Sequence, residues 1–387
     1  MEILHWLQDI REHLRVSQRR NALRQPGQGI DYTAEKDTVQ RIVSRLHPKR
    51  MRLRVMEIIE ETPTTKTFRL ERTDGPLPPF RPGQYVNLFV DVDGVLTSRP
   101  YSISSLPGAD FLELTVRDKP GGFVAPYLLN EVQVGDELET TGPAGSFYYE
   151  PLIDGRDLVF LAGGSGITPF MSILRDAVQH ERSLNIHLLY GSRLPEDVIF
   201  HEELTELSTQ QANLHYSLVI SEPPPDYEGL SGFLRPDIIL EQVGDPSGKT
   251  FYICGPNLMY DFCLAALTEM GVPRYRMKRE LYGPPDDVTQ EPGWPQDLAA
   301  DVVFTVEVEG QETIQASAGE PLLNSLERYG IVVPAVCRAG ECSACRTQLL
   351  AGQVFQPGHT ALRESDRAHG YIHACVSYPL QDLRIRV

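Results

Sequence analysis

The spacing of hydrophobic positions changes several times along the chain, and each change predicts a different kind of domain. The first part of the chain predicts an amphipathic helix over residues 2–24, because its apolar residues recur at helical spacing: Ile3, Leu7, Ile10 and Leu14. A Pro-Gly sequence near residue 26 ends this pattern, and a second short helix is expected over 34–46. Residues 1–50 are therefore predicted to be a helical N-terminal extension.

Short β-type runs then follow over residues 51–150. Strands are expected at 53–59, 66–70, 85–90, 111–116 and 137–141, with a further strand through Arg99, Tyr101 and Ser102. Asp-Gly, Pro-Gly and Gly-Gly turn signals separate these runs. Closely spaced strands joined by turns predict an antiparallel β-barrel.

Strands and helices alternate over residues 151–283. Apolar strands are expected at 157–162, 186–190, 214–220 and 250–254, with helices near 169–180 and 258–270. This alternation predicts an α/β domain with a mostly parallel sheet.

The last part of the chain begins with residues 284–300, which hold four prolines without periodicity and are read as a linker. A final domain follows over 301–387. It is expected to open with a hairpin, 302–309 and 312–316, and then a helix over 321–329.

Composition and charge argue against several classes of protein, including nucleic-acid-binding, membrane-spanning and disulfide-rich proteins. The chain is 41% hydrophobic with a net charge of −17, and residues 1–54 hold twelve Lys and Arg against six acids, so the remainder is more acidic than the total. A strongly acidic body argues against a nucleic-acid partner. No apolar run approaches the length of a membrane-spanning helix, and the start does not resemble a signal peptide. Six cysteines in 387 residues do not form a disulfide framework, so a cytoplasmic protein is expected.

Four cysteines near the C-terminus carry the most specific signal. Cys337, Cys342 and Cys345 have the spacing C-x4-C-x2-C, and Cys375 follows after 29 residues. This is the ligand spacing of a plant-type [2Fe–2S] cluster, and the residues within the loop are mostly small, as a loop wrapped around a cluster requires. The alternatives are a structural zinc site, which usually uses paired C-x2-C knuckles, and buried free cysteines. The spacing favours the cluster.

Two other motifs indicate bound nucleotides. Arg99-Pro-Tyr101-Ser102 supplies an aromatic face, a hydroxyl and a cation on one strand. A flavin cofactor needs these groups for its ring and its phosphate. The motif is short, so the alternative is an ordinary half-buried strand. Gly163, Gly164 and Gly166 follow an apolar strand and open a helix. That context favours a phosphate-binding loop over a simple tight turn.

These motifs, in this order, resemble the ferredoxin–NADP reductase superfamily over residues 51–387. The resemblance implies a flavin-binding barrel, a nucleotide domain and a β-grasp [2Fe–2S] ferredoxin domain placed last, as in phthalate dioxygenase reductase-type proteins. It assigns the flavin to Arg99, Tyr101, Ser102, Ser105 and a pyrophosphate element, Gly121, Gly122, Phe123, Val124 and Ala125. Relatives often have a hydroxyl residue at Ala125. FAD is favoured, with FMN as the alternative.

The resemblance also implies a binding site for a nicotinamide nucleotide, which is NADH or NADPH. Its expected binding residues are the glycine loop with Thr168 and Pro169, the ribose-facing Ser192 and Arg193, the motif Cys254-Gly255-Pro256, and Glu280. The residues expected at the reacting rings are Ser102, Thr168, Cys254 and Tyr282. Cys263 is read as core packing.

The expected function follows from electron counting. NAD(P)H gives two electrons as hydride, a cluster accepts one at a time, and a flavin converts between them. We therefore expect an NAD(P)H-dependent reductase whose partner is a protein acceptor such as an oxygenase, a desaturase or another metalloenzyme. The basic N-terminal helix is expected to contact protein, either the body of its own chain or the electron acceptor that it would dock, and attachment to an anionic membrane ranks last. The alternative is a non-catalytic electron-transfer or redox-sensing subunit of a larger complex.

Overall fold

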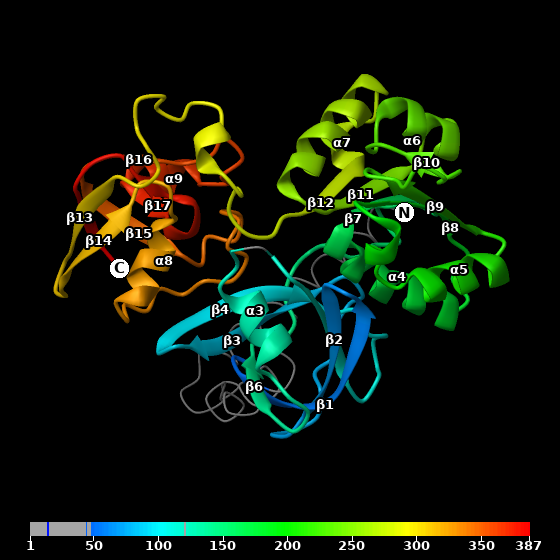
Figure 1. The fold of residues 1–387 in the computed structure, drawn as a ribbon, viewed down its shortest axis with the longest axis horizontal. Coiled ribbons are helices and arrows are strands. Elements are labelled where there is room, and N and C mark those ends of the chain that lie inside the picture. Colours follow the sequence, from blue (N-terminus) through cyan, green and yellow to red (C-terminus); the bar gives the residue numbers. More distant parts are fainter. Residues whose placement is uncertain (1–13, 15–43, 45–47, 120) are drawn as a thin grey trace. The chain divides into compact units, whose positions relative to one another are not determined.

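The computed structural model describes residue 14, residue 44, residues 48–119 and residues 121–387 (Figure 1). The helices expected at 2–24 and 34–46 thus lie almost entirely outside the described residues. The chain divides into two compact units between Pro48 and Lys49. Within the described residues, no helix is long and apolar enough to cross a membrane.

The first sheet is the expected antiparallel barrel. Its six strands lie in the order β4-β3-β6-β1-β2-β5, and a bridge between Ile103 and Leu114 joins the end of β4 to β5. Alternate residues at the start of β1 are buried, namely Met51, Leu53 and Val55. This pattern is expected of a strand with one face toward the core and the other toward solvent. The elements are β1 Met51–Thr62, β2 Thr65–Arg72, β3 Tyr85–Val92, β4 Val95–Ser102, β5 Leu112–Arg117, α3 Val124–Asn130 and β6 Glu137–Thr140.

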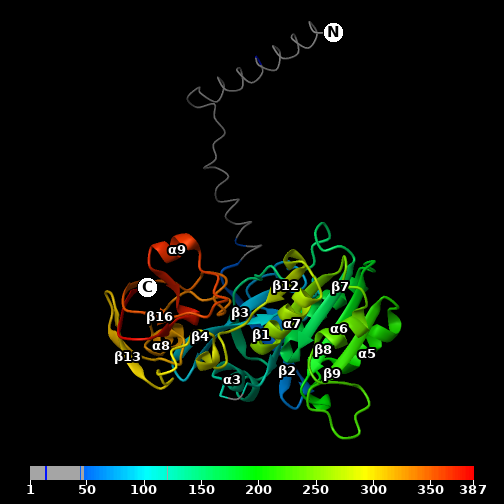
Figure 2. The ribbon, with the colours of Figure 1, turned by 90° about the horizontal axis from the view of Figure 1, so that it is seen from above.

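The second sheet is parallel, with the order β10-β9-β8-β7-β11-β12. Helices α4 and α5 contribute to the core on one face, and α6 and α7 to the core on the other (Figures 1 and 2). The elements are β7 Asp157–Gly163, η1 Gly164–Ile167, α4 Thr168–Gln179, β8 Asn185–Ser192, η2 Pro195–Asp197, α5 His201–Gln210, β9 Leu214–Ile220, β10 Leu230–Ser231, α6 Pro236–Val243, β11 Thr250–Cys254, α7 Asn257–Glu269, η3 Arg274–Arg276 and β12 Met277–Glu280.

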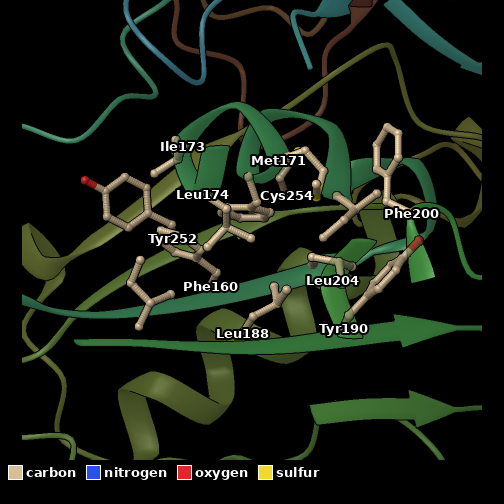
Figure 3. Close-up of a cluster of buried hydrophobic side chains, with 14 of the residues drawn as sticks. Phe160, Met171, Ile173, Leu174, Leu188, Tyr190, Phe200, Leu204, Tyr252 and Cys254 are labelled. Atoms are coloured by element: carbon tan, nitrogen blue, oxygen red, sulfur yellow. The ribbon is translucent and has the colours of Figure 1, made fainter. Parts of the chain in front are cut away.

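An aromatic core holds α4 against this sheet (Figure 3). Phe160 on β7 stacks on Phe170 of α4 with ring centroids 4.8 Å apart, and Tyr252 of β11 meets Phe160 edge to face at 5.5 Å. Cys254 lies at the end of the same strand and is 1% exposed. The glycine loop between β7 and α4 is therefore anchored on both sides by packed aromatic side chains.

The third sheet, of mixed direction, has the order β14-β13-β19-β15-β17, with β13 antiparallel to β14 and parallel to β19. Leu322, Leu323 and Leu326 of α8 are fully buried against it. The elements are β13 Val303–Val308, β14 Thr313–Ser317, α8 Leu322–Arg328, β15 Arg346–Ala351, β16 Val354–Phe355, α9 Glu364–Ala368, β17 Tyr371–His373, η5 Ala374–Val376, β18 Tyr378–Pro379 and β19 Leu383–Arg386.

The proline-rich segment 284–300 is packed against this last domain. It contains η4 Val288–Gln290, and Trp294 is only 4% exposed. The Trp294 ring meets Phe355 edge to face at 5.3 Å and Tyr378 at 6.3 Å, and its indole N–H donates to the Leu298 carbonyl. The segment that sequence alone marks as a linker thus supplies the centre of a small aromatic core.

Candidate functional site

The carboxyl ends of four parallel strands bring the predicted nucleotide residues to one edge of the sheet. Gly163 ends β7, Ser192 ends β8, Cys254 ends β11 and Glu280 ends β12. Cys254 is in register with Ala162 on one side and with Glu280 on the other. This is the edge at which open parallel sheets bind ligands.

Two glycines at this edge have no room for a side chain. A Cβ on Gly166 would lie 2.1 Å from the Cys254 carbonyl oxygen, and one on Gly255 would lie 3.1 Å from the Gly163 Cα. The loop after β7 therefore lies directly against the loop after β11. Gly164 has a φ of 52°, which favours glycine. The close contact of the two loops places the strand–glycine loop–helix turn at the ligand-binding edge of the sheet, and such a turn fits the pyrophosphate of a dinucleotide.

The remaining predicted nucleotide residues line the same edge. Thr168 begins α4 and donates its hydroxyl proton to the Ser165 carbonyl, with Pro169 buried beside it. Ser192 donates to the Leu194 carbonyl, and the exposed Arg193 guanidinium lies 3.8 Å from the Glu222 carboxylate. Arg193 thus already has an acidic neighbour.

The predicted flavin residues lie on β4 and just beyond it. Tyr101 packs against the barrel core, and Ser102 is buried. Arg99 donates through Nη1 to the Thr97 hydroxyl and to the Ser98 carbonyl, both at 2.7 Å. The Ser105 hydroxyl accepts from the Glu113 backbone N–H, and the Ser105 carbonyl accepts from Ser172, which joins the barrel to α4.

The predicted pyrophosphate element is a turn that opens a short helix, as expected. Gly121 has a φ of 71°, and the Gly122 N–H donates to the Lys119 carbonyl. Phe123 is 43% exposed and precedes α3, which begins at Val124. Val124 is buried in the barrel core, and Ala125 packs against it. A small apolar residue is accommodated at Ala125 because its side chain faces that core.

The flavin and nucleotide residues meet through one tyrosine. The hydroxyls of Ser102 and Tyr282 lie 3.0 Å apart, and the Tyr282 ring meets Tyr85 edge to face at 5.7 Å. Sequence reasoning missed Tyr85, which begins β3 and looks like an ordinary strand residue. This arrangement places a barrel hydroxyl, two aromatic rings and the end of β12 together.

Cys254 and Glu280 form the polar part of this edge. The Tyr260 hydroxyl accepts from the Gly255 N–H and donates to the Glu280 carbonyl. Burial raises the pKa of the Cys254 thiol, which therefore stays neutral. Burial, and then the negative charge of Glu341, raise the pKa of the Glu280 carboxyl to about 8.

The raised pKa of Glu280 predicts a specific pH dependence of stability. The unfolded chain releases this proton near pH 4.5 and the folded chain holds it to about pH 8, so the folded state binds more protons in between and its stability falls as the pH rises through that window. A Glu280→Gln variant should lose this dependence. At pH 8 the variant should melt at a temperature roughly 2–4 °C or more above that of the wild-type protein. A stability difference of about 1 kcal/mol produces a shift of this size.

Melting curves between pH 5 and pH 8 check this result. Glu60→Gln is the control, because the Glu60 side chain is 80% exposed. A difference between Glu280→Gln and wild type that stays constant across the pH range would contradict it.

The four predicted cluster cysteines gather in two pairs. The Sγ atoms of Cys345 and Cys375 lie 3.1 Å apart, and the Cys337 Sγ accepts from the Cys342 N–H at 3.4 Å. A hydrogen bond from Cys337 lowers the pKa of Cys342 to about 6, which favours the thiolate that metals bind. Among the described residues, no group of three or more His, Cys, Asp or Glu side chains lies close enough together to hold one metal ion. Two thiol pairs suit two irons with two thiolates each.

The loop that carries these cysteines packs against both other domains. Cys337 and Ala339 belong to the same buried cluster as Leu281 and the α6 and α7 residues. Asn87 of β3 donates to the Ala335 carbonyl at 2.7 Å. Arg279 of β12 pairs with Glu341 at 3.2 Å. None of these contacts has a local sequence signal, because each joins residues far apart in the chain.

Three family models match successive parts of the chain. An oxidoreductase FAD-binding domain matches residues 51–149, an oxidoreductase NAD-binding domain matches 160–264, and a 2Fe-2S iron-sulfur cluster binding domain matches 306–380. These matches confirm the predicted set of FAD, nicotinamide nucleotide and [2Fe–2S] cluster.

Similar proteins match this chain over most of their own length. The glycine betaine monooxygenase reductase subunit of Chromohalobacter salexigens is 29% identical over 87% of this chain and 95% of its own length. NADH oxidoreductase HCR of Escherichia coli is 29% identical over 86% of this chain and 96% of its own.

Solved structures match the whole of this extent or a part of it. Phthalate dioxygenase reductase shares the fold, with a TM-score of 0.66 at 22% identity over 87% of this chain and 98% of its own. The Amycolatopsis cytochrome P450 reductase GcoB matches 60% of this chain and 70% of its own with a TM-score of 0.55 at 29% identity. Paired thiols, a glycine loop at the sheet edge and three matching family models lead to one conclusion: the chain is an NAD(P)H-dependent oxidoreductase that joins FAD-, NAD- and [2Fe–2S]-binding domains, which confirms the resemblance found in its sequence.

Proposed function

We propose that this protein is the reductase component of an oxygenase system, which takes electrons from NAD(P)H and delivers them through its cluster to a partner oxygenase. The observation that carries the proposal is the position of the cysteine loop. It packs against Leu281 and receives a hydrogen bond from Asn87, so it lies beside the edge where Ser102, Tyr282 and Cys254 gather.

The roles of the site residues follow from their surroundings. When bound, FAD accepts two electrons as hydride from NAD(P)H and releases them singly to the cluster. Gly163, Gly166 and Gly255 let the loops after β7 and β11 meet at the edge where the dinucleotide would bind. Ser102 presents a hydroxyl at the meeting point of the two nucleotide sites, and Tyr282 covers that point. Cys254, as a neutral thiol, adds no charge there.

The cysteine loop completes the electron path. Cys337 and Cys342 would hold the iron nearer the other domains, because Cys337 packs among their buried side chains. Cys345 and Cys375 would hold the second iron. The names of relatives that serve a glycine betaine monooxygenase and a 3-ketosteroid-9-alpha-monooxygenase support an oxygenase as the acceptor.

The direct test is reconstitution with an oxygenase. Purified protein with NADH or NADPH should reduce ferricyanide, and it should support turnover of a purified oxygenase component from the same organism. Dye reduction without any oxygenase turnover would support a different acceptor. The absence of dye reduction with either coenzyme would favour the non-catalytic alternative.

Arg99 is proposed to bind the flavin phosphate. An Arg99→Ala variant should lose a charge-assisted hydrogen bond worth about 1.5–3 kcal/mol, so flavin affinity should fall roughly 10- to 150-fold. Fluorescence titration of the apoprotein with FAD measures this change. Arg81→Ala is the control, since Arg81 is a half-exposed barrel arginine paired with Glu150. Unchanged flavin affinity in Arg99→Ala would show that Arg99 does not bind the flavin phosphate.

The basic N-terminal segment is proposed to contact the partner protein. Its excess of arginines contrasts with the acidic remainder, and the chain divides into units directly before Lys49. A chain that begins at Lys49 should keep flavin, cluster and dye reduction, but its apparent affinity for the partner oxygenase should fall. Equal affinity in full-length and shortened proteins would exclude a docking role.

A further inference from the structure

A buried polar cluster joins strand β4 of the barrel to helix α8 and the cysteine loop. It consists of Thr97, Arg338 and Glu327, and each of these residues is outside the nucleotide and cysteine sets described above. Thr97 is 6% exposed and Arg338 is 4% exposed. The cluster therefore lies at a closed contact between two domains.

The Thr97 hydroxyl makes every hydrogen bond that a hydroxyl can make. It donates to Glu327 Oε2 at 2.9 Å, and it accepts from Arg338 Nη2 at 3.0 Å and from Arg99 Nη1 at 2.7 Å. A hydroxyl has one donor and two acceptor positions, so all three are used. Two of the three partners belong to the ferredoxin domain.

Arg338 is held in one orientation. It directly follows Cys337, its φ of 55° lies in the sparsely populated left-handed region, and its guanidinium pairs with Glu327 and bonds Asn324 Oδ1 at 3.2 Å. A buried ion pair requires close geometry, because each ion has lost its water. The pair therefore fixes the start of the cysteine loop relative to α8.

The same cluster reaches the proposed flavin phosphate residue. Arg99 shares the Thr97 hydroxyl with Arg338, and burial followed by the positive charge of Arg338 lowers the pKa of Arg99 to about 10. Glu327 supplies the negative charge between the two guanidinium groups. The cluster thus connects the start of the cysteine loop to the strand that carries Arg99.

We propose that Thr97, Arg338 and Glu327 are positioning residues, which hold the cysteine loop against β4 and thereby set the rate at which electrons pass from the flavin to the cluster. This inference rests on the proposed electron path. The three residues touch neither reacting group. They act by fixing the distance between two domains, and misplacement of about 1 Å reduces rates up to roughly 100-fold in well-oriented reactions.

The test compares four variants of the holoprotein. Thr97→Val keeps the shape and removes the hydroxyl, Thr97→Ser restores the hydroxyl, and Glu327→Gln removes the charge. Arg328→Gln is the matched control, because the neighbouring Arg328 pairs with Glu320 inside the ferredoxin domain. Anaerobic stopped-flow mixing with NADH or NADPH, whichever reduces the wild-type protein, separates flavin reduction from cluster reduction. The EPR spectrum of the dithionite-reduced cluster and amide hydrogen exchange over residues 335–341 are recorded for each protein.

Thr97→Val and Glu327→Gln should slow cluster reduction roughly 10- to 100-fold, with flavin reduction and EPR spectrum unchanged and faster amide exchange over 335–341. Thr97→Ser and Arg328→Gln should behave as wild type. Wild-type rates in Thr97→Val and Glu327→Gln would overturn the inference, and so would equal slowing in Thr97→Ser or Arg328→Gln. If wild-type protein fails to reduce its cluster with both NADH and NADPH, the proposed function itself is wrong, and the inference fails with it.

Discussion

A Cys345→Ser variant is expected to lose its bound iron and the visible absorption of the cluster, while it keeps flavin and NAD(P)H-dependent ferricyanide reduction. The thiolate is the ligand, and a serine hydroxyl does not replace it in a site built for four thiolates. Cys345 is buried in the core of the third sheet and pairs with Cys375. The flavin and nucleotide residues lie on the other two sheets, so their chemistry should continue.

Iron analysis and cytochrome c reduction check this result. Iron should fall from about two per chain to near zero, and reduction of cytochrome c through the cluster should be abolished. Cys263→Ala is the control, since Cys263 is buried within α7 among core residues and should leave the cluster intact. Full iron content in Cys345→Ser would end its assignment as a ligand.

A Trp294→Ala variant should strongly destabilise the ferredoxin domain. Removal of a buried tryptophan costs about 3–5 kcal/mol. For a domain of this size, that corresponds to a melting temperature lower by at least roughly 10 °C. The effect is expected although Trp294 lies in the proline-rich segment, because its ring fills the space between Phe355 and Tyr378.

Thermal loss of the cluster absorbance measures this destabilisation. Tyr275→Ala is the matched control, because that aromatic ring is 74% exposed and its removal should change stability by less than about 0.5 kcal/mol. If Trp294→Ala and the wild-type protein have the same melting temperature, segment 284–300 does not stabilise the ferredoxin domain and serves only as a linker.

Much of the fold is predictable because its signals are local. Strand β3 begins at Tyr85 and helix α8 spans Leu322–Arg328, close to the expected ranges, since alternation and turn residues are encoded within a few positions. The glycine loop before α4 and the cysteine spacing are equally local. The sequence analysis does not predict helices α5 and α6 or strands β10 and β12, because these elements are short and their sequences resemble loops.

The contacts that complete the site could not be predicted in this way. Thr97 and Arg338 are separated by 241 positions, and Asn87 and Ala335 by 248. Either residue of each pair, read alone, is an ordinary strand or loop residue. Trp294 was missed for the same reason, because its partners Phe355 and Tyr378 lie in a different part of the chain.

Electrons are proposed to enter at the flavin and to leave through the cluster. Anaerobic mixing of the oxidised holoprotein with a limiting amount of NADH or NADPH, followed at flavin and cluster wavelengths, tests this order. Flavin bleaching should come first and cluster reduction second, and Cys345→Ser should show only the first phase at an unchanged rate. Cluster reduction that precedes flavin bleaching, or a flavin phase that disappears with the cluster, would contradict this electron path.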